Sequence, residues 1–389
     1  MPYQVQIFDE LQPLVSQDWL ALFGRHPDPP ELISLAGIAG LKGFTFKNIV
    51  VRFDGELVLS LPIFCGQYPV AMTLDSGWLK TLISSAEHVL PWLFRPRFIA
   101  IGFIEGEWGQ VGVNRMMSQD VINTAWSLAT NAFQKLASRM NAGATVLWNF
   151  TEATLADIPQ NFASQYTLVP SQPYCTFDVR WSSLSQYLAS LPKDMRRYLQ
   201  RVQKRAGAVT IEHATTPGAD IERIYELYLA QVARSDLAFG VQSKQYFAEI
   251  CDKVPGAEYV LFKLEGELVA FEVVIERDDV LVSKYFAMEP EIGAQYWLYF
   301  VSWLHQVDYC IQKRIPEVYL GSASEGIKSK LGCATTPSFV LFKHRNPLLN
   351  AVLNHFRDEL AYNSDSPDDK QSVSANAAES GHLVGCVKS

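Results

Sequence analysis

Three residues in the second half of the sequence could carry proton transfer or stabilise a developing negative charge. Glu272 lies between apolar neighbours in a strand-like segment, where burial would raise the pKa of its carboxyl toward that of a general base. Tyr285 could act as a general acid. Lys328, in a turn after a strand, could donate to an oxyanion or a phosphate. Each also has a plainer interpretation: Glu272 and Lys328 can point into solvent, and Tyr285 can be a core aromatic.

The elements that would position these residues follow one another closely. The sequence predicts a three-strand meander, a helix, a strand and a lysine-bearing turn, over residues 258–289, 293–313, 317–323 and 325–332. A basic helix is predicted earlier, over 184–206. The turn contains a spaced set of small and charged residues: Gly321, Glu325, Gly326, Lys328 and Gly332.

Length and composition favour two globular domains and a polar tail. The chain has 389 residues, 48% of them hydrophobic and 19% charged, so it can bury sizeable cores. The first half predicts hairpin, strand, helix and strand up to residue 175, and the layout returns over 176–361. Residues 362–389 are polar and predict disorder, because they can bury too little apolar surface to offset their chain entropy.

Charge and motifs exclude several classes of function. A net charge of −8 argues against broad nucleic-acid binding. The basic helix with Arg197 and Arg201 could still bind a polyanion, although charge runs usually form a solvated surface. The six cysteines form no CxxC pair and no zinc-finger spacing, so no metal site is predicted. GxSxG, Walker and HExxH motifs do not occur.

The sequence predicts a cytoplasmic protein with reduced thiols. Its first residues have acidic side chains where a signal peptide would have a basic region and an apolar run. No stretch approaches the roughly 18 apolar residues of a membrane span.

Three segments together with this element order resemble the FemAB-like branch of the GNAT acyltransferase superfamily. They are KDMRRYLQRVQKR at 193–205, SKYFAMEPE at 283–291 and YLGSASEGIKSKLG at 319–332. The resemblance covers residues 30–355 and implies an α+β fold. Two tandem GNAT-like domains are expected, each a mixed, mostly antiparallel sheet flanked by helices. Residues 1–175 would form a degenerate domain, and 176–361 the acyltransferase domain.

The resemblance implies transfer of an acyl group from a thioester, on CoA or a carrier protein, to an amine. The acceptor would be a small molecule or a cell-envelope or natural-product precursor. Acyl-CoA would be a co-substrate, with no cofactor bound permanently. Lys328, Tyr285 and Glu272 would lie near the reacting carbonyl, between two splayed strands. The expected donor contacts are Gly293, Ala294, Gly321, Ser322, Arg197 and Arg201. The expected acceptor contacts, in a groove between the domains, are Tyr296, Trp297, Phe239, Glu325 and His344.

Two other functions remain open at this stage. An aminoacyl-tRNA-dependent transferase would use the basic helix to bind the tRNA backbone. A non-catalytic GNAT-fold ligand-binding protein is favoured by Glu289 and Glu291, which would compete with a phosphate for a helix N-terminus. The counterpart in the first domain, 112–117, contains Arg115 but lacks the glycine spacing. The sequence does not specify an oligomeric state.

Overall fold

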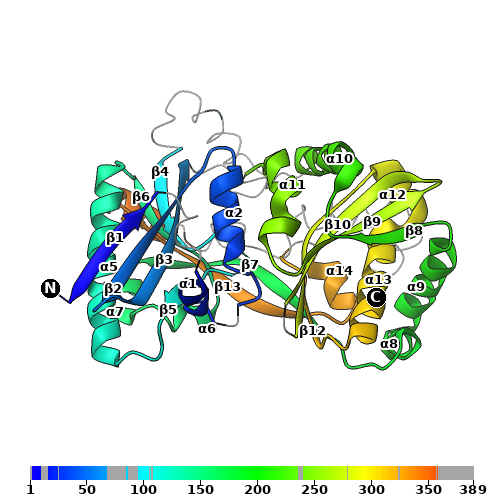
Figure 1. Cartoon of the computed structure of the whole chain (residues 1–389), viewed down its shortest axis with the longest axis horizontal. Helices are drawn as coiled ribbons and strands as arrows, with labels where there is room; N and C mark the ends of the chain where they lie inside the picture. The colour runs from blue at the N-terminus through cyan, green and yellow to red at the C-terminus, as the bar shows by residue number, and fades with distance from the viewer. Residues whose placement is uncertain are drawn as a thin grey trace. The chain divides into compact units, whose positions relative to one another are not determined.

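The computed structural model (Figure 1) describes the central part of the chain in several stretches. They are residues 2–9, 16–24, 26–67, 85, 95–104, 106, 108–234, 240–277, 279–322, 325–355 and 357. These residues divide into two compact units. Unit 1 comprises Met1–Gln172, Phe239–Tyr246 and Pro337–Tyr362, and unit 2 comprises Pro173–Ala238 and Phe247–Thr336. The tail predicted to be disordered lies outside the described residues.

Unit 1 is built on a mixed sheet with helices on both faces. Its strands, in spatial order, are β1 (Tyr3–Phe8), β2 (Thr45–Phe53), β3 (Glu56–Gln67), β4 (Arg97–Ile101), β6 (Ala144–Phe150) and β13 (Ala334–His344), and β5 (Gly112–Val113) also pairs with β3. β4 and β6 are parallel, whereas the other pairs are antiparallel. The helices are α1 (Gln17–Ala21), α2 (Glu31–Ala39), α5 (Gln119–Arg139), α6 (Glu152–Leu155), α7 (Gln160–Ala163) and α15 (Pro347–His355).

Unit 2 repeats this plan. Its sheet has the order β7 (Thr167–Asp178, which begins in unit 1), β12 (Glu317–Tyr319), β11 (Val280–Met288), β10 (Glu267–Arg277), β9 (Ala257–Leu264) and β8 (Thr210–Ala214). β11 and β12 are parallel, and the other pairs are antiparallel. Its helices are α8 (Leu184–Ser190), α9 (Lys193–Ala206), α10 (Ile221–Arg234), α11 (Lys244–Lys253, which begins in unit 1), α12 (Pro290–Tyr296), α13 (Leu298–Lys313) and α14 (Glu325–Lys330), with a 3₁₀ turn at Gly218–Asp220.

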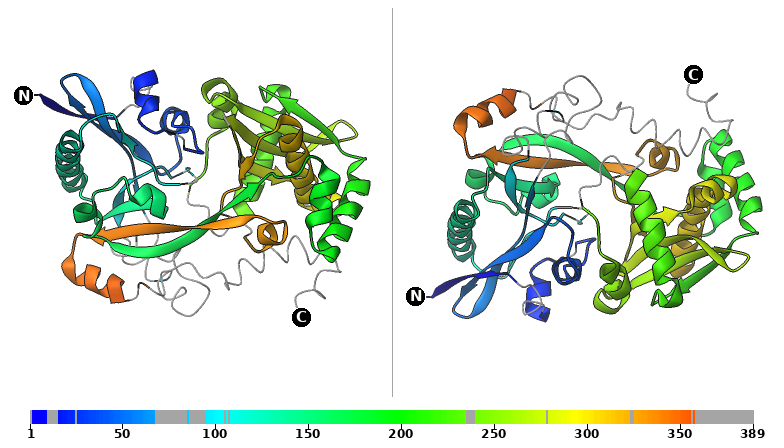
Figure 2. Two further views of the ribbon diagram at one scale, coloured as in Figure 1. Left: turned by 90° about the horizontal axis from the view of Figure 1, so that it is seen from below. Right: turned by 90° about the horizontal axis from the view of Figure 1, so that it is seen from above.

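Helices cover both faces of the unit 2 sheet (Figure 2). On one face, α8, α9 and α13 pack on alternate strand residues such as Val260 and Val274. On the other face, Phe247 of α11 contacts Phe271 of β10, with ring centroids 6.0 Å apart. This architecture confirms the predicted α+β fold of mixed, mostly antiparallel sheets flanked by helices.

The structure corrects three predicted boundaries. The helix expected over 293–313 divides at Trp297, which adopts a left-handed conformation with φ 53°. The helix expected over 184–206 divides before Pro192, whose ring cannot continue a helix. Residues 337–362, assigned from the sequence to the second domain, belong to unit 1 because β13 pairs with β6. Within the described residues, no helix has the length and apolar character needed to cross a membrane.

Candidate active site

The parallel pair β11–β12 separates partway along β11. Among the described residues, its pairing ends where Val282 meets Tyr319. Beyond this point β12 follows β7 instead: Leu320 N donates to the Cys175 carbonyl (3.0 Å), and Cys175 N donates to the Gly321 carbonyl (3.1 Å). β11 itself continues to Met288 against β10. The remainder of β11 therefore has a backbone edge that β12 does not pair with.

A β-bulge lies where the two strands separate. Val273 of β10 pairs with Tyr285, and Val274 pairs with Ser283, so Lys284 is an extra residue in β11. A bulge bends its strand and disrupts the local ladder, which explains why β11 turns away from β12 here. The predicted splayed strands are therefore present in unit 2, with Ser283 at their point of separation.

Glu272 lies next to this point and is completely buried, at 0% exposure. Its carboxylate accepts hydrogen bonds from Ser283 Oγ (2.5 Å), from Ser302 Oγ (2.7 Å) and from Gln306 Nε2. Burial raises the pKa of Glu272, and these three donors offset part of that rise. The interpretation of Glu272 as an outward-pointing surface residue is therefore wrong. A buried carboxyl with a raised pKa, joined to the half-buried Ser283, has the properties of a general base.

Sequence reasoning did not identify the three side chains that hold Glu272. Ser302 and Gln306 are four residues apart on α13, and therefore share one face of that helix. Polar residues at this spacing in a helix rich in large apolar side chains were the available signal. Ser283 could not be paired with Glu272 from the sequence, because the bulge shifts the register between β10 and β11.

Tyr285 and Glu272 lie on opposite faces of the sheet. Tyr285 pairs with Val273, so the alternation of side chains along the strands separates it from Glu272. The Tyr285 ring contacts Phe247 (centroids 5.4 Å apart) and Tyr228 (6.1 Å) on the α10–α11 face. The structure does not bring these two predicted catalytic residues together, and the acid role of Tyr285 stays a prediction.

Lys328 is buried, at 6% exposure, and holds the end of β12. Its ammonium donates to the carbonyls of Leu320 and Gly321, the latter at 3.1 Å. The solvated-lysine interpretation is therefore wrong. Gly321 has a φ of 66°, a conformation that favours glycine. Lys328 thus fixes the backbone of β12 just beyond the separation from β11. Its predicted bond to an oxyanion or a phosphate is untested.

The start of α12 is the predicted diphosphate-binding loop. Gly293 is buried against Met288, and a Cβ on Gly293 would lie 2.5 Å from Met288 Sδ. The carbonyls of Gly293 and Ala294 accept the N–H of Trp297. Glu289 forms an ion pair with Arg223 (2.6 Å), which compensates one of the two carboxylates that would repel a phosphate here.

The basic face of α9 is exposed, and two of its arginines lie over aromatic rings. Arg201 lies 5.8 Å from the Tyr198 ring centroid, and Arg205 lies 4.9 Å from that of Trp297. Arg197 is exposed one turn before Arg201. The arginines of this face therefore lie over the buried Tyr198 ring and the half-buried Trp297 ring, and Tyr296 is the residue before Trp297.

The remaining residues predicted to contact the acyl donor or the acceptor belong to several separate segments of the chain. Phe239 lies outside the described residues. Glu325 is the half-buried first residue of α14, and Ser322 is half-buried after β12. His344 belongs to unit 1, where it pairs with Ala144 of β6. Its role as an acceptor contact stays a prediction.

Two buried cysteines of unit 2, Cys310 and Cys333, are poor nucleophiles. Burial raises the pKa of Cys310 and that of Cys333 to about 12. Both thiols are then protonated at neutral pH, and a thiol is far less nucleophilic than a thiolate.

Unit 1 has the corresponding parallel pair, β4–β6, but the chain itself fills the space beyond it. The pairing ends at Ile101 and Leu147. Farther along β6, Gly109 N donates to the Asn149 carbonyl (2.7 Å). A Cβ on Gly109 would lie 2.3 Å from the Trp148 carbonyl oxygen, so only glycine fits. The gap that β11 and β12 leave in unit 2 is closed in unit 1.

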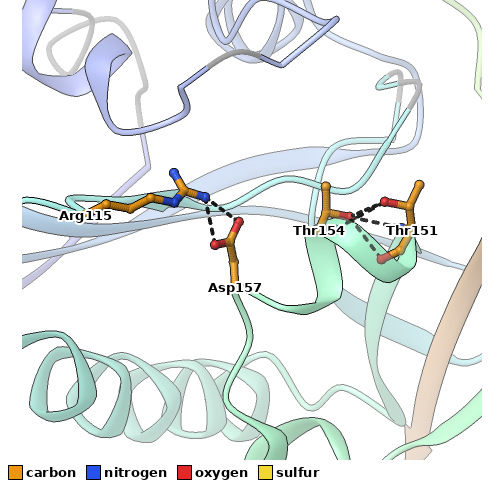
Figure 3. A network of polar contacts seen from close by, with 4 residues as sticks. All are labelled: Arg115, Thr151, Thr154 and Asp157. Carbon is orange, nitrogen blue, oxygen red and sulfur yellow. Dashed lines mark hydrogen bonds and ion pairs between the residues drawn. The ribbon is translucent and has the colours of Figure 1, made fainter. Parts of the chain in front are cut away.

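Arg115, the basic residue of the unit 1 loop at 112–117, also has a partner within the chain. Arg115 Nη2 donates to both carboxylate oxygens of Asp157, each at 2.7 Å (Figure 3). Asp157 follows the short helix α6, which starts with a reciprocal Thr151–Thr154 capping box. Arg115 therefore already has an anionic partner within unit 1.

Comparisons with known proteins agree with this fold. Residues 189–329 match a family model described as an acetyltransferase (GNAT) domain. FemX has a similar structure at 12% identity, covering 85% of this chain and 95% of FemX with a TM-score of 0.51. The C-terminal domain of a protein described as a lysylphosphatidylglycerol synthetase, from Agrobacterium fabrum, is similar at 11% identity, covering 85% of this chain and 93% of that domain with a TM-score of 0.50. No curated protein matches the sequence.

Proposed function

We propose that this chain, which has a tandem GNAT fold of the FemAB-like type and a GNAT acetyltransferase domain at residues 189–329, transfers an acyl group from a thioester to an amine. The observation that carries the proposal is the separation of β11 from β12 beside the buried Glu272–Ser283 pair. The thioester is that of acyl-CoA or of an acyl carrier protein. The acceptor is a small molecule or a cell-envelope or natural-product precursor.

The edge of β11 beyond Val282, with which β12 does not pair, is the proposed position of the donor. A thioester carbonyl beside this edge accepts a hydrogen bond from a backbone N–H, which stabilises the negative charge that develops on its oxygen. The thioester chain occupies the gap that β12 leaves when it follows β7. Lys328 acts as a positioning residue, because it holds the Leu320 and Gly321 carbonyls at the far side of this gap.

Glu272 removes the proton from the acceptor amine, through Ser283. The amine nitrogen attacks the thioester carbonyl carbon, and its proton passes to Ser283 Oγ while the Ser283 proton passes to the Glu272 carboxylate. The carbon–sulfur bond then breaks, and sulfur leaves with the electron pair as a thiolate. The raised pKa of Glu272 favours proton uptake at this step.

Each chain has one donor site in this proposal. In unit 2, β12 stops pairing with β11 at Val282, whereas in unit 1 Gly109 pairs with β6 beyond the corresponding point. The pairing of Glu289 with Arg223 removes part of the argument for a non-catalytic protein, since one of the two opposing carboxylates is compensated.

Native mass spectrometry with acetyl-CoA, a long-chain acyl-CoA and free CoA tests the donor. The expected result is one CoA species per chain. The Glu272→Gln variant serves as a matched control, since it should bind the same species without turnover. Absence of CoA binding at every acyl length would refute the CoA form of the proposal, and acyl carrier protein would be tested next.

A second candidate function, transfer from an aminoacyl-tRNA, is favoured by the exposed basic face of α9. Arg201 and Arg205 are placed over rings and present their charges to solvent, which suits phosphate backbones. Binding of a charged tRNA should then weaken steeply with salt. A binding constant independent of salt would exclude this candidate.

A further inference from the structure

A row of buried polar side chains lies on the unit 1 sheet face that α1 covers. Trp19 Nε1 donates to Ser60 Oγ (2.9 Å), and Ser60 Oγ donates to Asn48 Oδ1 (2.8 Å). The neighbouring strand residues Ile49 and Leu61 point the other way, into the core formed with α5. Trp19, Asn48 and Ser60 are fully buried, and the proposed transfer uses none of them.

Gln110 points to the same face. Gly112 pairs with Ser60, and a Cβ on Gly112 would contact Leu22 and Phe23 at the end of α1. Val111 and Val113 belong to the α5 core, so alternation directs Gln110 to the α1 side, like Gly112. Gln110 is only 3% exposed.

These amides have hydrogen-bonding capacity that the described residues do not use. Within that part of the chain, neither Gln110 Nε2 nor Gln110 Oε1 has a hydrogen-bond partner, and Asn48 Nδ2 has none. Buried amide groups are nearly always paired, because an unpaired one loses its water without compensation. Two unsatisfied amides on one face indicate that a group outside the described residues supplies their partners.

The type of group that fits follows from the donors and acceptors present. Gln110 offers an N–H donor and a carbonyl acceptor in one plane, which is complementary to a second amide. Gln110 and Asn48 are both uncharged, so they would not compensate the desolvation of a buried ion. Phe46 lies on this face two residues before Asn48, with the Phe103 ring 6.4 Å from it, and these rings can pack on an apolar part of the ligand.

We propose that this face of unit 1 binds an uncharged ligand through a carboxamide or peptide group, held by Gln110 and Asn48. The site is separate from the strand edge of unit 2 and does not depend on acyl transfer. A buried water molecule is the competing explanation for the unpaired atoms. The two explanations differ in whether an amide compound binds saturably.

Ligand-observed NMR on the full chain without any acyl donor tests the proposal. The probes are N-methylacetamide and N-acetylglycine N-methylamide, with acetate as the charged comparison. The expected result is saturable binding of the amides and not of acetate, with at least tenfold weaker binding to Gln110→Leu. The same substitution should raise Tm, because it replaces an unpaired buried amide by an apolar group of similar size.

Gln134→Leu is the matched control, since Gln134 is an exposed glutamine on α5. It should leave amide binding unchanged. Absence of saturable amide binding to the wild-type chain would overturn the proposal, whether or not the variants fold. Unchanged binding in a folded Gln110→Leu variant would overturn it too. If Gln110→Leu lowers Tm and leaves binding of the amide probes unchanged, the partner of the Gln110 side chain is a structural water.

Discussion

Replacing Glu272 with glutamine removes a buried ionisable group while leaving the side-chain shape almost unchanged. The Ser283 and Ser302 hydroxyls can rotate to accept as well as donate. Gln306 Oε1 is buried and, within the described residues, has no partner, so a flipped Gln306 can accept from the new amide. The hydrogen-bond network therefore survives, and we expect the free energy of unfolding to change by no more than about 1 kcal/mol at low pH.

The effect of Glu272→Gln on turnover should be much larger. A positioned general base contributes roughly 10²–10⁴-fold to the rate, which corresponds to about 3–5 kcal/mol of activation free energy. We expect kcat to fall by this factor, with little change in the binding of the acyl donor. Thiol release from the donor identified by mass spectrometry measures kcat.

The pH dependence has a definite sign. Burial raises the pKa of Glu272 in the folded chain above its ordinary value, so folding favours the protonated carboxyl. The wild-type free energy of unfolding should therefore fall as pH rises from the ordinary carboxyl pKa through the folded one, and Glu272→Gln should lack this loss. Over the same interval, kcat/KM of the wild type should rise as the carboxylate forms. The residual rate of the Glu272→Gln variant should not rise over this interval. His305, on α13, is already uncharged at neutral pH, because burial lowers its pKa to about 4.

Ser302→Ala is the control, because it removes one hydrogen bond to the carboxylate and keeps the carboxylate itself. An unchanged kcat in a folded Glu272→Gln variant would refute the role of Glu272 as a base. Equal losses of kcat in Glu272→Gln and Ser302→Ala would mean that the network has a structural role only.

Three further predictions concern the backbone and the basic face. Lys328→Met should remove the ammonium donor of the Leu320 carbonyl and one of the two donors of the Gly321 carbonyl, lowering stability by about 1–3 kcal/mol in denaturant titrations. Turnover should fall at least tenfold, and unchanged kinetics would remove Lys328 from the site. Gly109→Ala should destabilise the chain by about 1–3 kcal/mol by thermal unfolding, because its Cβ would overlap a backbone carbonyl. Gly326→Ala, which has open space around it, should be nearly neutral, and equal effects of both would contradict the account of the closed strand pair. Arg201→Gln should lower the salt dependence of polyanion binding by about one unit of slope if α9 contacts phosphates, and an unchanged slope would argue that α9 is only a solvated surface.

The sequence was sufficient to predict the order of elements, because hydrophobic periodicity and turn residues are local signals. The meander, the following helix, the short strand and the lysine turn are all present. Burial of Glu272 was foreseen as one of two possibilities, since its neighbours on both sides are apolar. The sequence could not show which sheet face each side chain occupies. The bulge at Lys284 and the faces of Tyr285 and Glu272 depend on pairing between strands.

Sequence reasoning also missed features that depend on distant segments. Nothing local to Lys328 shows that its ammonium binds carbonyls of the preceding strand. The division of the long helix at Trp297 was not predicted, because a left-handed tryptophan is rare and carries no glycine or proline signal. The need of Gly109 for close approach to β6 is visible only once β4 and β6 are paired.

The pairing of β13 with β6 constrains the order in which the chain can fold during synthesis. Leu341 pairs with Leu147 and Phe339 with Phe150, across a separation of nearly two hundred residues. A ribosome that has finished β6 must therefore still translate all of unit 2 before this side of unit 1 can be completed. Until then β6 has an uncovered strand edge, the kind of surface that favours mispairing and chaperone binding. Tandem domains usually fold one after another during synthesis. Unit 1 cannot complete its sheet in this way, because it needs β13, which is synthesised after unit 2.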